Sequence, residues 1–313
     1  MCCLFGLIDY KGYFTPRQKN RVLAVLAKEC EARGTDATGI AYNLNGGMKI
    51  IKAPLPAHAM RFRIPPQAMV IMGHTRMTTQ GSEKKNRNNH PFHGAVRGME
   101  FSLAHNGVLN NDKSLRVTEK LPSTDIQTDS YVAVQLLQKK QAITFESLKF
   151  MAEQVEGSFC FTVLDCANNF YIVKGSNPIC IYQYEREGFY IYASTEEILK
   201  KAISRMGLYM PKRGEKVNVS CGDIVKFSPT GSITKGSFSY NSLDDLWLME
   251  RYRPYSDCTT YYKSVCTDIE QERLEELKWM ATCFGFEPEE VEVLYKEGYT
   301  LDEVEELLYQ CEY

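Results

Sequence analysis

The pattern of apolar and polar positions predicts a mixed α and β structure over most of the chain. Apolar runs bounded by Gly, Asn or Pro indicate strands at residues 4–10, 38–42, 69–74 and 101–105. Helical spacing of apolar positions predicts helices over residues 16–32, 124–139 and 145–155. Both kinds of element therefore occur in the first half of the chain.

Short strands dominate the next part of the sequence. They are expected at residues 158–165, 170–174, 179–183 and 189–193, followed by a helix over 194–206 and a hairpin of 217–220 with 224–228, turning at Cys221-Gly222-Asp223. Strands joined by tight turns favour antiparallel pairing. Since no glycine-rich phosphate loop follows the first strand, the pattern disfavours a dinucleotide-binding or P-loop fold.

Composition narrows the class of protein. Hydrophobic residues make up 44% and charged residues 24% of 313 residues, with a net charge of −2, which is typical of a soluble protein without a nucleic-acid partner. No apolar run of about 18 residues predicts a membrane span, and no secretory signal is recognisable. The 11 cysteines show neither metal-ligand nor disulfide-scaffold spacing. We therefore expect reduced thiols, a cytoplasmic location, and no metal or cofactor.

Charge is distributed unevenly and suggests a division of the chain. Residues 268–313 hold 15 acidic and 3 basic residues, a net charge of −12, whereas the rest carries +10. We expect a main domain over 2–238, a linker over 239–268 with a docking helix at Leu246-Trp247-Leu248-Met249, and a small helical module over 269–313. The acidic part could attract the basic part or bind a different partner, but a solvated acidic helical face is the plainer interpretation of the charge.

Three short helices are predicted in the module. Pro288 lies at an early position of the second helix, which stops at Gly298, and Thr300 with Glu303 forms a capping box for the third. The expected core comprises Leu277, Met280, Phe284, Val291, Leu294, Val304, Leu307 and Leu308. The pattern around Phe284-Gly285-Phe286 and Gly298 loosely resembles a ubiquitin-associated-type module, which would bind a partner protein. A plain helical appendage or a dimerisation element fits the same pattern.

Candidate chemistry begins at Met1-Cys2-Cys3. Removal of Met1 would leave Cys2 with a thiol and a free α-amine, whose pKa lies near 8, so the amine can accept the thiol proton. Taken alone, the Met1-Cys2 dipeptide favours a buried structural cysteine, because many proteins start with Met-Cys by chance.

Five further segments change this interpretation. They are Arg33-Gly34-Thr35-Asp36-Ala37-Thr38-Gly39-Ile40, Gly73-His74-Thr75-Arg76-Met77-Thr78-Thr79-Gln80-Gly81, Asn89-His90-Pro91-Phe92, His105-Asn106-Gly107-Val108-Leu109-Asn110-Asn111 and Ser123-Thr124-Asp125. In this order they resemble the class II glutamine amidotransferases, over about residues 2–235. The resemblance implies an α+β fold: a four-layer αββα N-terminal-nucleophile hydrolase sandwich of two antiparallel sheets, here followed by the small all-α three-helix module.

The resemblance also implies roles for individual residues. Cys2 would attack the side-chain amide of L-glutamine, and Asn106 and Gly107 would stabilise the oxyanion. Arg76 would bind the α-carboxylate, a geometry that lysine cannot reproduce, and Asp125 would pair with the α-ammonium. Thr79 and His90 are further candidate substrate-binding residues, and they complete the list of expected site residues.

Each of these residues has a structural interpretation as well. Arg76 could be a surface cation, Asp125 a helix N-cap, and Asn106-Gly107 a hairpin turn. The histidines at 74, 90 and 105 fit structural hydrogen bonding better than base catalysis. Three positions depart from the family pattern: Cys3 replaces a glycine, Met77 an aromatic residue and Gln80 a histidine.

The acceptor of the ammonia is left open by the sequence. Family members usually fuse this domain to a second catalytic domain, and about 75 residues remain here. We expect a stand-alone subunit that supplies ammonia to a separate acceptor enzyme, and leave homo-oligomerisation open. A γ-glutamyl amide hydrolase and a catalytically silent scaffold are the alternatives.

Overall fold

The computed structural model describes residues 2–207, 210–211 and 214–240, together with 274–275, 277–278, 281–282, 286–296, 301, 304 and 308. The chain divides into two compact units, residues 1–248 and 249–313. Among the described residues, no helix is long and apolar enough to cross a membrane.

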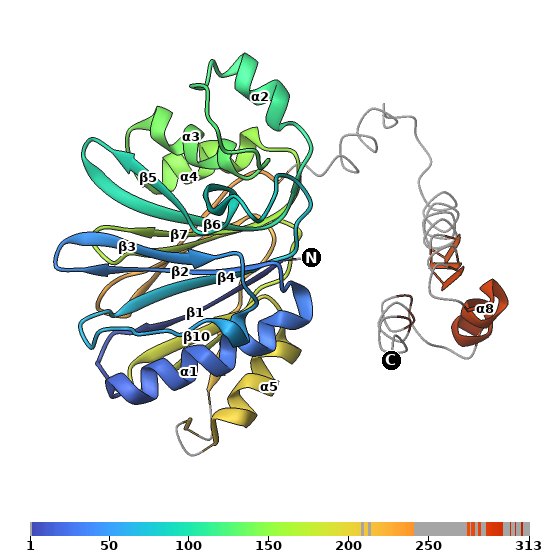
Figure 1. Cartoon of the computed structure of the whole chain (residues 1–313), viewed down its shortest axis with the longest axis horizontal. Helices are drawn as coiled ribbons and strands as arrows, with labels where there is room; N and C mark the ends of the chain where they lie inside the picture. The colour runs from blue at the N-terminus through green and yellow to red at the C-terminus, as the bar shows by residue number, and fades with distance from the viewer. Residues whose placement is uncertain are drawn as a thin grey trace, which may run out of the picture. The chain divides into compact units, whose positions relative to one another are not determined.

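Two antiparallel sheets form the centre of the first unit (Figure 1). Sheet A has seven strands in the order β11-β9-β10-β1-β4-β2-β3, and sheet B has six in the order β13-β12-β8-β7-β6-β5. Sheet A consists of β1 (Cys3–Asp9), β2 (Ala37–Leu44), β3 (Gly47–Ala53), β4 (Val70–Arg76), β9 (Cys180–Tyr184), β10 (Phe189–Ala193) and β11 (Glu215–Lys216). Sheet B consists of β5 (Phe92–Val96), β6 (Met99–Leu109), β7 (Gly157–Asp165), β8 (Phe170–Lys174), β12 (Asp223–Phe227) and β13 (Ile233–Ser237).

Helices cover the outer face of each sheet. Helices α1 (Pro16–Glu29) and α5 (Glu196–Met206) share an apolar core with sheet A. Helices α3 (Tyr131–Lys140) and α4 (Phe145–Gln154) do so with sheet B, and the short α2 (Asp112–Thr118) lies beside them. A third core fills the space between the sheets. The predicted α+β four-layer αββα sandwich is therefore confirmed.

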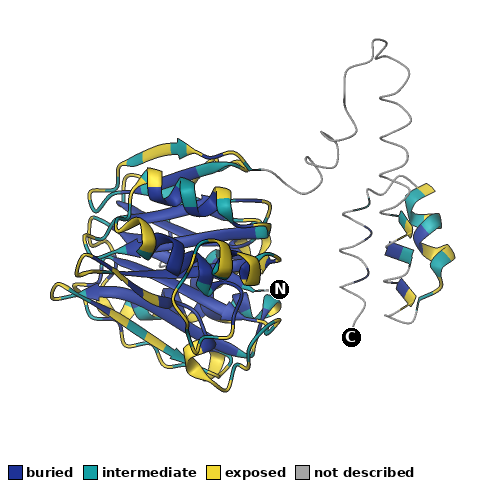
Figure 2. Cartoon of the chain, turned by 90° about the horizontal axis from the view of Figure 1, so that it is seen from above, coloured by how far each residue is buried: buried dark blue, intermediate teal, exposed yellow. Residues whose placement is uncertain are grey.

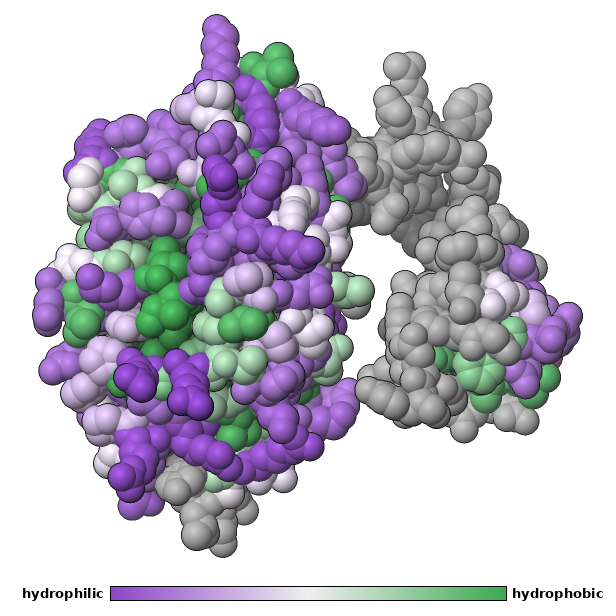
Figure 3. All heavy atoms as spheres, in the orientation of Figure 1, coloured by the Kyte–Doolittle hydropathy of each residue, from purple (hydrophilic) through white to green (hydrophobic). Residues whose placement is uncertain are grey.

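The first strand shows how the sequence produces these layers. Phe5 and Leu7 belong to the core under α1, whereas Leu4 and Ile8 belong to the core between the sheets. Successive side chains of a strand point to opposite faces, so a continuous apolar run suits a strand buried on both sides. Figure 2 shows the resulting buried interior, and Figure 3 shows that the outer surface on the viewed face is mostly hydrophilic.

Local signals define the ends of α1. Thr15 is its N-cap, and Thr15 and Gln18 form a reciprocal capping box ahead of Pro16 at the first turn. Short 3-10 helices η1 (Cys30–Arg33), η2 (Ala57–Ala59) and η3 (Asn86–Asn88) lie in the connections. Helix η1 directly extends α1 and brings Arg33 to the start of β1, where its Nε donates to the Cys2 carbonyl at 3.1 Å.

Two predicted elements differ from the structure. The helix expected over 124–139 begins only at Tyr131, because the residues before it make tertiary hydrogen bonds instead: Gln127 N–H donates to Asn88 Oδ1 at 3.0 Å. The hairpin expected between 217–220 and 224–228 is also wrong. Residues 217–220 are not a strand. Strand β12 pairs instead with β8 and with β13, and β13 was not expected because it has few apolar residues.

The second unit is described only in part. Helix α8 (Pro288–Lys296) begins at Pro288, and Leu277, Ala281, Val291, Val304 and Leu308 form a small buried cluster. Leu294 is partly buried against it. The expected core residues Met280, Phe284 and Leu307 and the expected docking helix at 246–249 lie outside the described residues.

Candidate active site

Strand pairing brings Cys2 and Arg76 to the same end of sheet A. Strands β1 and β4 are antiparallel, with Cys3 opposite Thr75, so Cys2 and Arg76 occupy neighbouring positions at this end. The Cys2 thiol donates to the Met77 carbonyl at a distance of 3.5 Å. The segment that follows β4 therefore lies directly against the thiol.

Strand β6 of sheet B brings Asn106 and Gly107 to this end of the sandwich. Gly107 has a φ of +144°, and a Cβ there would lie 2.0 Å from the Ser158 carbonyl oxygen, so only glycine fits. Asn106 is fully buried, and its Nδ2 donates to Ser194 Oγ at 3.4 Å.

A small pocket joins these segments. Its cavity volume is about 10 Å³, room for roughly one water molecule. Typical small-molecule sites measure roughly 300–1,000 Å³, so the pocket is closed in this structure. It is lined by Cys2, Arg76, Met77, Thr79, Gln80, His90, His105, Gly107, Thr128, Asp129 and Ser130.

The guanidinium of Arg76 holds the wall of this pocket together. Nη2 donates to the carbonyls of Gln80 at 2.6 Å and Gly81 at 2.8 Å, and Nη1 donates to Asn89 Oδ1 at 2.7 Å. Arg76 is only 3% exposed, so it is not a surface cation. Its planar fork spans the segment between β4 and η3.

Asp125, expected at the site, does not lie there. Its side chain is 86% exposed and pairs with Arg87 Nη1 at 2.9 Å. Asp129 lines the pocket instead, and its Oδ2 accepts the Leu109 backbone N–H at 2.7 Å. Two of the Thr-Asp pairs in the sequence lie close together here, at 124–125 and 128–129. The second directly precedes the apolar run of α3, which is the signal that would have identified Asp129.

Three buried histidines lie at or beside the pocket: His90 and His105 line it, and His74 packs against His90. Burial lowers the pKa of His74 to about 3 and that of His105 to about 4, and lowers the pKa of His90 well below its ordinary value. His74 Nε2 bonds the His105 carbonyl at 2.9 Å, and His105 Nδ1 bonds Ser130 Oγ at 2.8 Å. All three rings are therefore neutral near pH 7, and His90 packs against His74 with ring centres 4.2 Å apart and the planes tilted by 32°.

The environment of Cys2 favours the protonated thiol. Burial raises the pKa of Cys2 above its ordinary value, although the Met77 backbone and the positive charge of Arg76 act in the opposite direction. A nearby base is therefore needed to generate the thiolate. Within the described residues, no cluster of three or more His, Cys, Asp or Glu side chains has an arrangement that would hold a metal ion.

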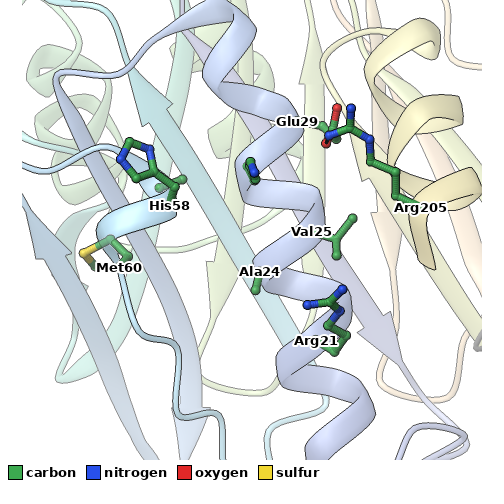
Figure 4. A pocket seen from close by; sticks show the side chains of 9 residues that line it. Arg21, Ala24, Val25, Glu29, His58, Met60 and Arg205 are labelled. Carbon is green, nitrogen blue, oxygen red and sulfur yellow. Dashed lines mark hydrogen bonds and ion pairs between the residues drawn. The ribbon is translucent and has the colours of Figure 1, made fainter.

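A larger depression lies elsewhere on the unit, between α1, η2 and α5 (Figure 4). Its walls include Arg21 and Lys28 of α1, and Glu29 of α1 pairs with Arg205 of α5. It shares no lining residue with the pocket at Cys2. The candidate nucleophile therefore lies in the smaller of the two pockets.

Comparison with known proteins agrees with this geometry. A family model for class II glutamine amidotransferases matches residues 20–156. The chain is 30% identical over 164 residues to a glutamine–fructose-6-phosphate aminotransferase of Caldanaerobacter subterraneus, covering 50% of this chain and 26% of that protein. For its counterpart from Streptococcus pyogenes serotype M1 the identity is 29% over 191 residues, covering 58% and 30%. The chain thus spans less than a third of the length of these relatives.

Solved structures show the same fold. A glutamine phosphoribosylpyrophosphate amidotransferase from B. subtilis, complexed with ADP and GMP, superimposes with a TM-score of 0.59 at 18% identity, covering 77% of this chain and 50% of that one. Together with the family match, this identifies a class II glutamine amidotransferase domain within the chain, and its two-sheet sandwich has the N-terminal-nucleophile hydrolase fold.

Proposed function

We propose that the chain, after loss of Met1, hydrolyses L-glutamine to glutamate and ammonia through a thioester on Cys2. The observation that carries this proposal is the shared pocket of Cys2, Arg76, Gly107 and Asp129, which combines a thiol, a cation, a backbone donor and a carboxylate. A free amino acid with an amide side chain presents the complementary groups.

Cys2 is the nucleophile in this proposal. Its new α-amine, with a pKa near 8, takes the thiol proton, which compensates for the raised pKa of the buried thiol. The thiolate sulfur attacks the amide carbon, and the protonated amine returns the proton to the leaving nitrogen. Ammonia departs, and water then opens the thioester to release glutamate and restore the thiol.

The two charged residues of the pocket select the substrate. Arg76 binds the α-carboxylate, and Asp129, rather than Asp125, binds the α-ammonium, because Asp125 is paired with Arg87 outside the pocket. Thr79 and His90 line the same pocket and contribute polar and ring contacts. A protein-bound glutamine lacks both charges and would be disfavoured.

The oxyanion is stabilised by Asn106 Nδ2 and the Gly107 N–H. Loss of one such donor typically costs about 10²–10³ in rate. Since Arg76 is engaged by the carbonyls of Gln80 and Gly81, an arriving carboxylate competes with them. We infer that residues 77–81 move outward to admit glutamine into the closed pocket.

Ammonia goes to a separate acceptor protein in this proposal. The chain spans less than a third of the length of the curated relatives that it matches. We further propose that residues 269–313 bind a partner protein. The support is their net charge of −11 and the small apolar cluster around α8. Deleting this region should abolish association with the acceptor protein and leave glutamine hydrolysis intact; unchanged association would contradict the proposal.

The decisive experiment starts from protein with Cys2 at its N-terminus, produced by cleaving a removable tag. Glutamate release should require the cleavage and be absent from Cys2→Ser, and a diazo-ketone glutamine analogue should add its mass to Cys2. Preference for other γ-glutamyl amides over free glutamine would instead indicate a γ-glutamyl amide hydrolase. Failure to turn over any of these compounds, together with absence of labelling, would indicate a silent scaffold.

A further inference from the structure

Ser194 connects the two halves of the proposed catalytic machinery. It follows β10 directly and is fully buried between the sheets. Its Oγ accepts the backbone N–H of Leu4, on the nucleophile strand, at 2.8 Å, and accepts Asn106 Nδ2, on the opposite sheet, at 3.4 Å. One hydroxyl therefore links the strand that carries Cys2 to the side chain expected to stabilise the oxyanion.

The orientation of the Asn106 amide depends on this contact. Nδ2 has two hydrogens, so donating one to Ser194 leaves the other for the oxyanion. Asn106 Oδ1 has no hydrogen-bond partner in the part of the chain that the structure describes, so it does not help to fix the amide. Without Ser194, the amide could turn its oxygen toward the oxyanion, where it would repel.

Asn177 acts, through the backbone, on the second proposed oxyanion donor, the Gly107 N–H. Its Nδ2 donates to the carbonyl of Asn106 at 2.9 Å. In a trans peptide the C=O and the following N–H point in opposite directions, so fixing this carbonyl also fixes the direction of the Gly107 N–H. Asn177 is itself anchored, because its backbone N–H donates to the Phe159 carbonyl at 3.3 Å.

We propose that Ser194 and Asn177 are positioning residues for the oxyanion site, one for each of its two donors. The inference rests on the proposed glutaminase function and extends it to residues outside the pocket. Neither residue is needed to bind the α-carboxylate or the α-ammonium of glutamine. Their loss should therefore lower kcat while leaving KM nearly unchanged, because the oxyanion exists only in the transition state and the tetrahedral intermediate.

The test compares Ser194→Ala and Asn177→Ala with two matched controls. Ser102→Ala removes a fully buried hydroxyl that donates to Met72 Sδ, and Asn43→Ala removes a buried amide that donates to the Asp165 carbonyl. We expect each test variant to lose about 10- to 100-fold in kcat, since misplacement of a catalytic group by about 1 Å can cost 10²-fold. The controls should stay within about twofold of wild type.

A second measurement separates positioning from general damage. Alkylation of Cys2 by iodoacetamide is a displacement at a saturated carbon and forms no oxyanion, so its rate should stay at the wild-type value in both variants. Unchanged kcat in the variants, or equal losses in kcat and alkylation rate, would overturn the inference. If Ser194→Ala does not fold, the half-buried Asn177 carries the test. A wild-type protein that is alkylated but inactive on glutamine would instead overturn the proposed function, and this inference with it.

Discussion

The carboxylate of Asp129 is bound to the backbone N–H of Leu109 at 2.7 Å, two residues beyond Gly107 on β6. This bond fixes the second carboxylate oxygen relative to the proposed oxyanion site. Asn at position 129 would keep an acceptor for Leu109 but lose the negative charge. We expect Asp129→Asn to raise KM for glutamine about 10- to 100-fold, because a hydrogen bond to a charged group is worth about 1.5–3 kcal/mol. Steady-state glutaminase kinetics measure this.

The matched control for that variant is Asp125→Asn. Asp125 is exposed and pairs with Arg87, and such surface pairs contribute little. Its KM should remain within about twofold of wild type. A larger effect at position 125 than at position 129 would restore the assignment made from the sequence.

Replacement of Arg76 by lysine should separate charge from geometry. Lysine keeps the cation but lacks the planar fork that Arg76 presents to the Gln80 and Gly81 carbonyls in the closed pocket and to a carboxylate that displaces them. We expect Arg76→Lys to raise KM at least about tenfold and to increase proteolysis within residues 77–89. Arg87→Lys, on the exposed side of the same segment, should do neither. A KM unaffected by Arg76→Lys would exclude this residue from carboxylate binding.

The buried pair of Lys19 and Asp9 should contribute strongly to folding. Nζ and Oδ2 are 3.2 Å apart, with side-chain exposures of 2% and 0%, and Nζ also donates to the Ala68 carbonyl at 2.8 Å. Lys19→Met leaves the carboxylate without its counter-charge. We expect the free energy of unfolding to fall by about 3–5 kcal/mol.

Urea unfolding measures this change, and Arg21→Met on the exposed side of the same helix is the control. Its effect should stay within about 0.5 kcal/mol. Equal losses for the two variants would show that the buried pair has no special role.

Stability should fall as the pH drops below 6.5. The folded pKa of His74 is about 3 and that of His105 about 4, both below the ordinary 6.5. Between pH 6.5 and these folded pKa values, the unfolded chain therefore binds more protons than the folded chain. The stability is fully present above pH 6.5 and is lost as the pH falls toward the folded pKa values. At pH 5 each histidine should cost about 2 kcal/mol relative to pH 7.

Denaturant unfolding at pH 7 and pH 5 tests this expectation. In His74→Gln, which keeps a donor for the His105 carbonyl, the loss between the two pH values should shrink by about 2 kcal/mol. His58→Gln, at an exposed histidine, should leave the loss unchanged. A wild-type stability that is the same at both pH values would contradict the buried, neutral state of these rings.

Several elements were predictable because their signals are local. The buried run at 4–10, the capped helix from Pro16 and the short strands from 158 to 193 depend on periodicity and neighbouring residues, and the structure contains all of them. The helix expected from Thr124 was wrong at its start because Gln127, Asp129 and Ser130 bond to distant residues. The missed strand β13 has an exposed, weakly apolar sequence, and its partner β12 supplies the pairing.

The sequence by itself determined the class of domain and a nucleophile candidate, because the order and spacing of short motifs can be read without knowing which residues are close in space. It singled out Cys2, Arg76, Asn106 and Gly107 as candidate site residues. Only the tertiary structure placed Asp129, and not Asp125, in the pocket at Cys2, since both follow a threonine and differ in where the chain folds them. The roles inferred for Ser194 and Asn177 were likewise invisible, because their contacts with Asn106 span 88 and 71 residues. Hydrogen bonds between segments this far apart in the chain depend on strand order and register, which local sequence does not encode.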